Sequence, residues 1–415
     1  MNLPKFSMGI GDRFAHQGRA QLAAFVKAKT LGVDVAPVWN KSNREHNIVH
    51  SEPTSVREEA DAAVKALGWK GEYFVDADHI GVKTVDRFIG PSDFFTLDVA
   101  DFINKPAADG DIKAFAANYK RYAGSLKIPG VSGALDISSD RIEAIARKYL
   151  FAAQEAGRIY RHVEAAKGKG KFVTEVSMDE TDQPQTPGEL FFILAAIADQ
   201  KIPIQTIAPK FTGRFNKGVD YVGDVQQFEK EFNDDLAVIA HAIKEFGLPG
   251  NLKLSVHSGS DKFSIYGAIR KAVQRTGAGL HVKTAGTTWL EELIGLASAG
   301  GEGLQIAQDV YRQALERFDE LCGPYATVID IDKSRLPTAD AVGKWSGAEY
   351  AETLRHDQKN PRYNANFRQL LHVGFKVAAQ MGERYISALE KFEPTVAENV
   401  TRNTFDRHLK PIFVG

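Results

Sequence analysis

The chain has 415 residues, of which 43% are hydrophobic, so it can bury a large core in one barrel or in about two to three domains. Its formal net charge is −1, which gives no electrostatic case for binding nucleic acid or an anionic membrane. The single cysteine, Cys322, rules out an internal disulfide, and no apolar stretch typical of a signal peptide follows Met1. The longest apolar run, 191–198, is too short to cross a bilayer. We therefore expect a globular cytoplasmic protein.

Eight stretches of the sequence are typical of strands, and helical patterns separate them. The expected strands cover residues 6–12, 33–39, 73–79, 94–98, 172–180, 202–211, 252–258 and 280–284. Helices are expected at about 18–30, 55–68 and 85–89, before 199, and at 225–246 and 264–275. Residues 100–170 are longer than one crossover needs and indicate a helical insertion, whereas 304–415 indicate a helical extension that covers the outside.

This alternation of strands and helices predicts a parallel sheet. Eight strand–helix units predict its closure into a TIM-type (β/α)8 barrel, a single domain over residues 1–415. An open, doubly wound sheet is the alternative. The first strand–helix turn, GIGDRF at 9–14, lacks the G-x-G-x-x-G pattern, so dinucleotide binding has no support.

The last two expected strands each have one apolar and one polar face, because successive strand side chains point to opposite sides. Leu254, Val256, Leu280 and Val282 form the apolar faces, and Lys253, Ser255, His257, His281 and Lys283 form the polar ones. In a parallel barrel the outer face packs on helices, while the inner face and the carboxyl ends of the strands build the active site.

Three histidines are expected at the ends of the third, seventh and eighth strands: His79, His257 and His281. Neutral imidazoles beside a carboxylate suit a divalent cation such as Zn, Mn, Co or Ni, with a position open for substrate. Their spacing is not a local motif. The alternative is that one or two of them are general bases or structural residues.

Charged residues at the same strand ends are candidates for acid–base chemistry and for binding an acidic substrate. Glu175 or Asp78 is a candidate general acid or base, although Glu175 and Lys253 would also form a buried ion pair inside the barrel. The simpler role for Lys210 and Lys283 is that of cations that bind an acidic substrate, and the alternative is that they form a Schiff base with it. Backbone N–H groups at 258–262 and at the helix start 286–288 would hold a carboxylate or phosphate. The candidate substrate-binding residues are Asp12, Arg13, Asp76, Asp179, Glu180, Lys210, Ser258, Ser260, Lys262, Lys283 and Thr287.

At these positions the sequence resembles the tagaturonate/fructuronate epimerases of bacterial hexuronate catabolism. The matching blocks are GIGDR at 9–13, DADH at 76–79, EVSMDET and PQTP within 175–187, HSGSDKFS at 257–264, HVKTAGT at 281–287 and RQLLHV at 368–373. They span nearly the whole chain, and DADH together with HSGSDKFS is quite specific. Members of the family carry an N-terminal extension ahead of the first strand, whereas GIGDR lies here within the first 13 residues, so oligomer contacts or substrate scope can differ.

The resemblance implies a metal-dependent isomerase that interconverts D-tagaturonate and D-fructuronate at C4. Carried onto the matching positions, Asp78 is the proton acceptor and Glu175 the proton donor, in preference to Asp76, Asp179 or Glu180. His79, His257 and His281 are then the ligands of the divalent cation. The expected partner is a small hexuronate, and whether the chain forms a homo-oligomer stays open.

Chemistry constrains the reaction further. In a 2-keto hexuronate, C4 is α to neither the ketone nor the carboxylate, but it carries the β-hydroxyl of an aldol. Retro-aldol cleavage of C3–C4, rotation of the aldehyde and re-addition would therefore invert C4, with the metal as Lewis acid at the C2 carbonyl. The alternatives are a metal-dependent aldolase or a 4-epimerase of a related ketose such as tagatose or fructose, and a sugar-acid-binding barrel without catalysis.

Overall fold

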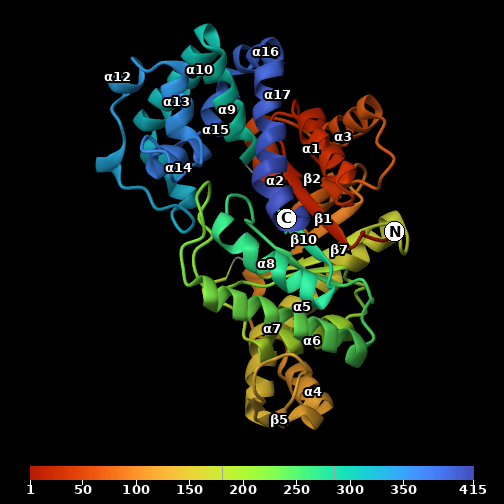
Figure 1. Ribbon diagram of the computed structural model, residues 1–415. Coiled ribbons are helices and arrows are strands. Elements are labelled where there is room, and N and C mark those ends of the chain that lie inside the picture. Colours follow the sequence, from red (N-terminus) through yellow and green to blue (C-terminus); the bar gives the residue numbers. More distant parts are fainter. Residues whose placement is uncertain (180, 285–286) are drawn as a thin grey trace.

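The structure is a computed structural model that describes residues 1–179, 181–284 and 287–415. Within these residues eight parallel strands close into a barrel in the order β1-β10-β9-β8-β7-β4-β3-β2 (Figure 1). The strands are β1 (Phe6–Gly11), β2 (Ala36–Ser42), β3 (Phe74–Ile80), β4 (Phe94–Asp98), β7 (Val173–Ser177), β8 (Thr206–Ala208), β9 (Lys253–Val256) and β10 (Leu280–Lys283). The predicted (β/α)8 barrel is confirmed, and the open sheet is wrong.

Along β2, β3, β4 and β7 the interior of the barrel changes from apolar at the strand starts to polar toward the strand ends, whereas β9 and β10 carry the buried polar residues Lys253 and His281 near their starts. Val38, Phe74, Phe94 and Val173 form a separate apolar cluster. Two residues further along the same face of their strands come the buried polar side chains Asp76, Thr96 and Glu175. The opposite faces, including Leu254 and Val282, belong to the large cluster between strands and helices. This gradient concentrates the polar side chains at the carboxyl ends of the strands.

Several strands are shorter than the sequence predicts. β8 covers Thr206–Ala208 rather than 202–211, because Pro203 and Pro209 lack the N–H groups that a ladder needs.

β2 is shifted along the chain, since it begins at Ala36 instead of 33 and continues to Ser42. This shift brings Asn40, Lys41 and Ser42 onto the strand that ends at the site.

Helices cover the outside of the barrel. They are α1 (Gly18–Thr30), α2 (Asn43–Val49), α3 (Thr54–Leu67), the 3-10 turn η1 (Val85–Phe88), α5 (Ser139–Lys167), α6 (Pro187–Asp199), α7 (Val225–Phe246), α8 (Phe263–Thr276) and α9 (Thr287–Ala299). α1 and α7 have the predicted bounds, and α3 ends at Gly68 in the left-handed conformation, as expected for a glycine stop. In the described ranges no helix is both long and apolar enough to cross a membrane.

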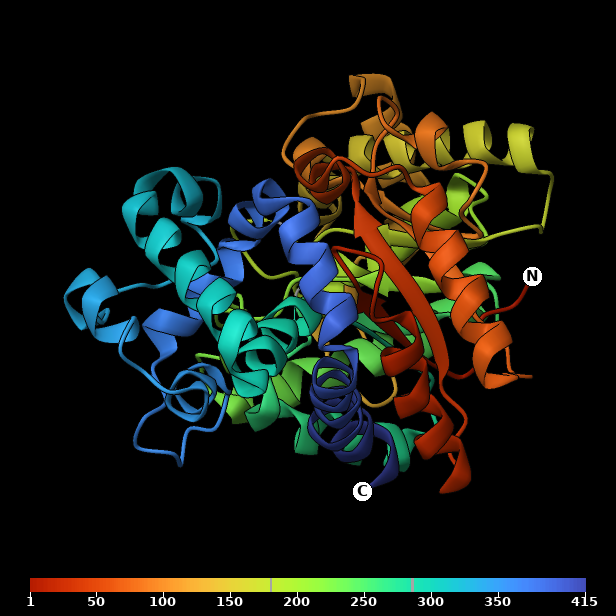
Figure 2. The same ribbon diagram turned by 90° about the horizontal axis from the view of Figure 1, so that it is seen from above.

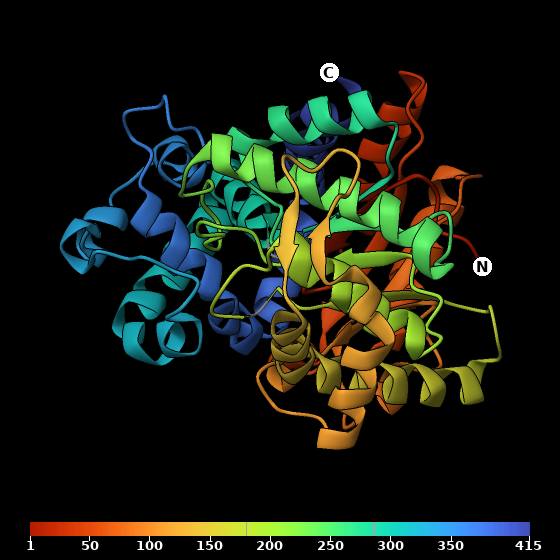
Figure 3. The same ribbon diagram turned by 90° about the horizontal axis from the view of Figure 1, so that it is seen from below.

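The predicted helical insertion also contains strands. η2 (Ala100–Phe102), α4 (Asp109–Tyr119) and η3 (Lys120–Tyr122) lead to an antiparallel pair, β5 (Gly124–Leu126) and β6 (Leu135–Ile137), before α5 begins. The pair stands outside the barrel (Figures 1 and 3). Tyr119 and Tyr122 pack on Phe192 and Phe246 of α6 and α7, so the insertion is anchored on the outer helix layer.

The C-terminal extension is helical, as predicted, but it does more than cover the outside. It comprises α10 (Gly301–Glu316), α11 (Phe318–Cys322), η4 (Gly323–Tyr325), η5 (Lys333–Arg335), α12 (Ala339–Val342), α13 (Gly347–Leu354), α14 (Ala365–Val373), α15 (Phe375–Met381), α16 (Glu383–Lys391), α17 (Glu393–Arg402) and the π-helical segment η6 (Asn403–Val414). Together with α9 it forms a second hydrophobic cluster beside the barrel (Figure 2). Its Tyr325 and His372 line the cavity at the strand ends.

Candidate active site

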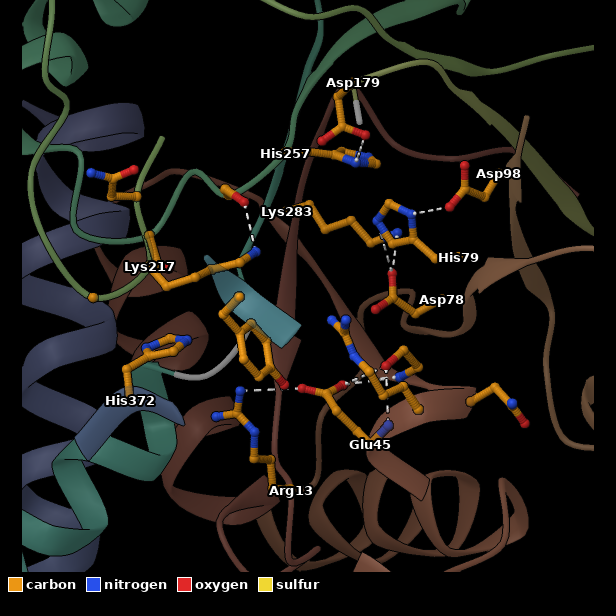
Figure 4. A pocket seen from close by; sticks show the side chains of 18 of the residues that line it. Arg13, Glu45, Asp78, His79, Asp98, Asp179, Lys217, His257, Lys283 and His372 are labelled. Atoms are coloured by element: carbon orange, nitrogen blue, oxygen red, sulfur yellow. Dashed lines mark hydrogen bonds and ion pairs between the residues drawn. The ribbon is translucent and has the colours of Figure 1, made fainter. Parts of the chain in front are cut away.

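A cavity of about 330 Å³ lies at the carboxyl ends of the strands (Figure 4). Its charged and histidine lining residues are Arg13, Arg44, Glu45, Asp78, His79, Asp98, Asp179, Lys217, His257, Lys262, Lys283 and His372. A second cavity of about 480 Å³ adjoins it, since Arg44, Asp179, Asn216, Lys217, His257, Ser258 and Tyr325 line both.

His79, Asp179 and His257 form a potential metal-binding group, because one ligand atom from each lies within 4.8 Å of the others. His79 reaches this position through the end of β3, where the register with β4 shifts between Ala77 and Ile80. The His79 backbone has φ 51°, in the left-handed region, which turns the side chain toward the cavity. The rings of His79 and His257 are 5.1 Å apart.

Carboxylates hold both imidazoles of this group. His79 Nδ1 lies 3.1 Å from Asp98 Oδ2, while His257 Nδ1 lies 3.1 Å from Asp179 Oδ1 and its Nε2 lies 2.8 Å from Glu175 Oε1. Burial lowers the pKa of both histidines, but the carboxylates outweigh it and raise the pKa of His79 to about 10 and that of His257 to about 9. Both imidazoles therefore stand where positive charge is favoured.

Lys283 occupies the centre of the barrel mouth. Its Nζ lies 2.7 Å from Asp76 Oδ2, 2.7 Å from Asp78 Oδ1 and 3.4 Å from Glu175 Oε1. Burial and neighbouring carboxylates raise the pKa of Asp76 to about 6, whereas Lys283 and His79 hold the pKa of Asp78 below its ordinary value although burial would raise it. Asp78 is thus an ionised carboxylate that faces the cavity.

The donor set fits a divalent cation. Asp78 and Asp98 lie beside His79, Glu175 and Asp179 lie beside His257, and Lys283 joins Asp76, Asp78 and Glu175. Buried negative charge is costly without compensation. Two imidazoles and a carboxylate are ligands that Zn, Mn, Co and Ni accept.

His281 lies apart from this group. Its Nδ1 is 2.9 Å from Ser7 Oγ and its ring packs on Phe94, deep in the barrel. Burial lowers its pKa to about 3. The geometry brings Asp179, and not His281, together with His79 and His257.

Glu175 is fully buried behind His257 and does not line either cavity. Its Oε1 accepts a hydrogen bond from Thr96 Oγ1 at 3.1 Å as well as facing His257 and Lys283. The alternative ion pair with Lys253 is wrong, because Lys253 Nζ donates instead to the carbonyls of Leu3 and Pro4 at the barrel floor.

The polar groups of three predicted substrate-binding side chains make hydrogen bonds within the protein. Asp12 accepts N–H groups from Phe14, Ala15 and His16 ahead of α1. Lys262 Nζ donates to three carbonyls, and Thr287 Oγ1 donates to Asp261 Oδ2. These residues shape the loops around the cavity.

Most of the other predicted residues line one or both cavities, whereas Asp76 contacts Lys283 and lines neither. Arg13, Ser258 and Ser260 line the first, with Arg13 Nη2 3.3 Å from Glu45 Oε1. Lys210 lines the second. Glu180 and Gly286 lie outside the described residues.

Sequence reasoning did not single out Glu45, Lys217, Tyr325 or His372 as site residues. Glu45 sits on α2, in a stretch without a predicted element, although S42-x-x-E45 is a capping-box signature that the structure confirms. His372 belongs to the matched block RQLLHV, but nothing in that block indicates which surface it faces. Lys217 and Tyr325 lie in segments without periodicity.

The chain matches known proteins over nearly its whole length. A family model described as UxaE, tagaturonate epimerase, matches residues 1–410. The tagaturonate/fructuronate epimerase of Thermotoga maritima is 28% identical over 420 aligned residues, which cover 96% of this chain and 79% of that protein. The fructuronate-tagaturonate epimerase of Cohnella laeviribosi, in a crystal structure with one glycerol, shares 25% identity with a TM-score of 0.80 over 99% of this chain and 82% of that chain. Its native crystal structure has a TM-score of 0.78 at 23% identity over the same shares.

Proposed function

The chain belongs to the tagaturonate epimerase family and is an isomerase, and on this premise we propose that it interconverts D-tagaturonate and D-fructuronate by inverting C4. The observation that carries this proposal beyond similarity is the His79–Asp179–His257 group beside the Asp78–Lys283 pair in one cavity. Such a site combines residues that can bind a metal cation with an ionised base, Asp78, and a proton donor, Lys283.

We assign His79, Asp179 and His257 to hold a divalent cation. When bound, the cation would act as a Lewis acid toward the C2 carbonyl of the substrate. Asp98 orients His79 through its 3.1 Å contact, and Glu175 orients His257 at 2.8 Å, as carboxylates behind metal-binding histidines do.

Asp78 is the base of the proposed retro-aldol step. It takes the proton of the C4 hydroxyl, the C3–C4 bond breaks, and its electron pair moves onto the C1–C3 unit while C4–C6 becomes an aldehyde acid. The aldehyde turns, C3 adds to its other face, and Lys283 gives a proton to the C4 oxygen. Asp78 then passes the proton that it took to Lys283, so that both groups return to their starting states. Lys283 suits this task because it lies 2.7 Å from Asp78 and lines the cavity.

Glu175 has a different role in this scheme from that of the direct proton donor that the family resemblance implies. It contacts Lys283 at 3.4 Å and His257 at 2.8 Å but does not line the cavity. We assign it to position these two groups.

The test follows D-tagaturonate carrying deuterium at C4 by NMR, with purified enzyme before and after chelation and metal return. We expect D-fructuronate with the label retained, because retro-aldol cleavage leaves the C4 hydrogen in place, and we expect chelation to abolish turnover until metal is restored. Loss of label to water would contradict the retro-aldol step. Accumulation of three-carbon products would favour an aldolase, and turnover of D-tagatose with none of D-tagaturonate would favour a ketose 4-epimerase.

A further inference from the structure

A clamped turn crosses the mouth of the cavity at residues 216–219. Lys262 Nζ donates to the carbonyls of Asn216 at 2.9 Å and Val219 at 2.8 Å. Arg368 Nε, from α14, donates to the Gly218 carbonyl at 2.6 Å. The Lys217 N–H donates to the Val328 carbonyl at 2.8 Å, so the barrel loop and two parts of the extension hold this turn.

The clamp presents the side chain of Lys217 to the site. Lys217 lines both cavities, and its Nζ lies 3.0 Å from Ser258 Oγ, next to His257 in the chain (Figure 4). Gly218 has φ 74°, a conformation that favours glycine, and a Cβ there would lie 3.3 Å from His372 Nδ1. The turn therefore keeps a close, fixed geometry against α14.

The charge of Lys217 is left for a ligand at the first cavity, where the other buried or half-buried cations are compensated. Arg44 and Lys210 also have no ion pair among the described residues, but Arg44 is exposed and stacks on Tyr325, and Lys210 lines only the second cavity. Arg13 pairs with Glu45 at 3.3 Å, Arg214 with Asp330 at 3.2 Å, and Lys283 with its three carboxylates. The Lys262 ammonium donates hydrogen bonds to three backbone carbonyls. In the part of the chain that the structure describes, the polar contact of the Lys217 ammonium is the neutral Ser258 hydroxyl, and no carboxylate lies within ion-pair distance.

We propose that Lys217 binds the carboxylate of the hexuronate and holds the three-carbon aldehyde acid while it turns. This inference rests on the proposed function. After C3–C4 cleavage the C4–C6 fragment keeps its carboxylate but has no covalent link to the rest of the substrate, so an anchored carboxylate retains it while the aldehyde presents its other face. A neutral ketose offers Lys217 no charge, and the residue therefore determines specificity for the acid.

The experiment compares the wild type, Lys217→Met and Lys217→Arg, with Lys70→Met as a matched control. Lys70 is exposed and lines neither cavity. Calorimetry gives the affinities for D-tagaturonate and for D-tagatose, and NMR gives epimerisation and any free three-carbon products.

We expect Lys217→Met to weaken tagaturonate binding about 10- to 150-fold, the range for one charge-assisted hydrogen bond, and to leave tagatose binding unchanged. It should also release three-carbon products that the wild type retains. Lys217→Arg should restore much of the preference for the acid, and Lys70→Met should change it less than threefold.

Equal losses for both sugars, or no loss for tagaturonate, would overturn the role of Lys217, as would a wild type without preference for the acid. A wild type that binds tagaturonate through Lys217 but does not epimerise it would instead reject the proposed function. The two failures are thus distinguishable.

Discussion

His257 and His281 differ in the groups that contact their ring nitrogens, and they lie at different heights in the barrel. His257 follows the end of β9, whereas His281 is the second residue of β10. Both ring nitrogens of His257 face carboxylates, at 3.1 and 2.8 Å, whereas His281 Nδ1 faces the neutral hydroxyl of Ser7. Carboxylates outweigh burial at His257 and raise its pKa to about 9, while burial lowers the pKa of His281 to about 3. The carboxylates around His257 also favour a metal cation, which displaces the imidazole proton when it binds, and His257 lies within ligand distance of His79 and Asp179, so we assign the ligand role to His257.

This difference predicts the metal content of two histidine variants. His257→Ala removes one of the grouped ligands and should reduce the bound metal from about one ion per chain to near zero. His281→Ala, the matched control, should keep about one ion per chain because His281 is not in the group. Elemental analysis after gel filtration measures both. Complete loss of metal in His281→Ala would return His281 to the ligand set in place of Asp179.

At the scale of elements, the sequence predicts the helix bounds and helix stops that depend on neighbouring residues alone. The bounds of α1 and α7 follow from helical periodicity, and the Gly68 stop follows from its left-handed conformation. The α2 helix was missed although Ser42 and Glu45 form a capping box, because its seven residues contain too few apolar positions for periodicity. The contact of Arg368 with Asp261 joins two matched blocks 107 residues apart, and no local pattern predicts such a pair.

This pair links the loop after β9 to α14, and its removal has a predictable cost. Arg368 Nη2 lies 3.1 Å from Asp261 Oδ2, and both side chains are fully buried. Asp261→Asn would leave the guanidinium without its counter-charge, so we expect the free energy of unfolding to fall by about 3–5 kcal/mol. Urea unfolding measures it. Arg214→Gln, which breaks an exposed pair with Asp330, should cost less than about 1 kcal/mol, and equal costs would contradict the argument.

At the scale of the whole molecule, strict strand–helix alternation was enough to predict the closed barrel, but not the route of the last third of the chain. The amphipathic helices of the extension pack into their own hydrophobic cluster with α9. Periodicity shows that such helices have an apolar face and does not show which partner covers it. Tyr325 and His372 line the cavity because of tertiary contacts, which the periodicity of the sequence does not predict.

Buried neutral histidines outside the metal-binding group give the whole fold a common response to acid. Burial lowers the pKa of His46 to about 3, and it lowers the pKa of His356, His372 and His408 below the ordinary value as well. In the unfolded chain an imidazole has a pKa near ~6.5, so below that pH the unfolded state binds more protons than the folded state. The stability that these residues contribute is thus present above about pH 6.5 and is lost as the pH falls toward the folded pKa.

The metal-free protein should therefore lose free energy of unfolding steadily from about pH 6.5 to 5, with His46 alone contributing about 2 kcal/mol of that loss. His46 is buried, and its Nδ1 lies 2.9 Å from Ser51 Oγ, a contact that the amide of His46→Gln can approximate without titrating. The variant should flatten the dependence of stability on pH in this window, whatever its stability at pH 7. The raised pKa values of His79 and His257 act in the opposite sense, because stability from a raised pKa is present below about pH 6.5 and is lost as the pH rises toward 9 and 10. Urea unfolding at several pH values separates the two effects, and an unchanged slope in His46→Gln would contradict the assignment of His46 as a neutral, buried imidazole.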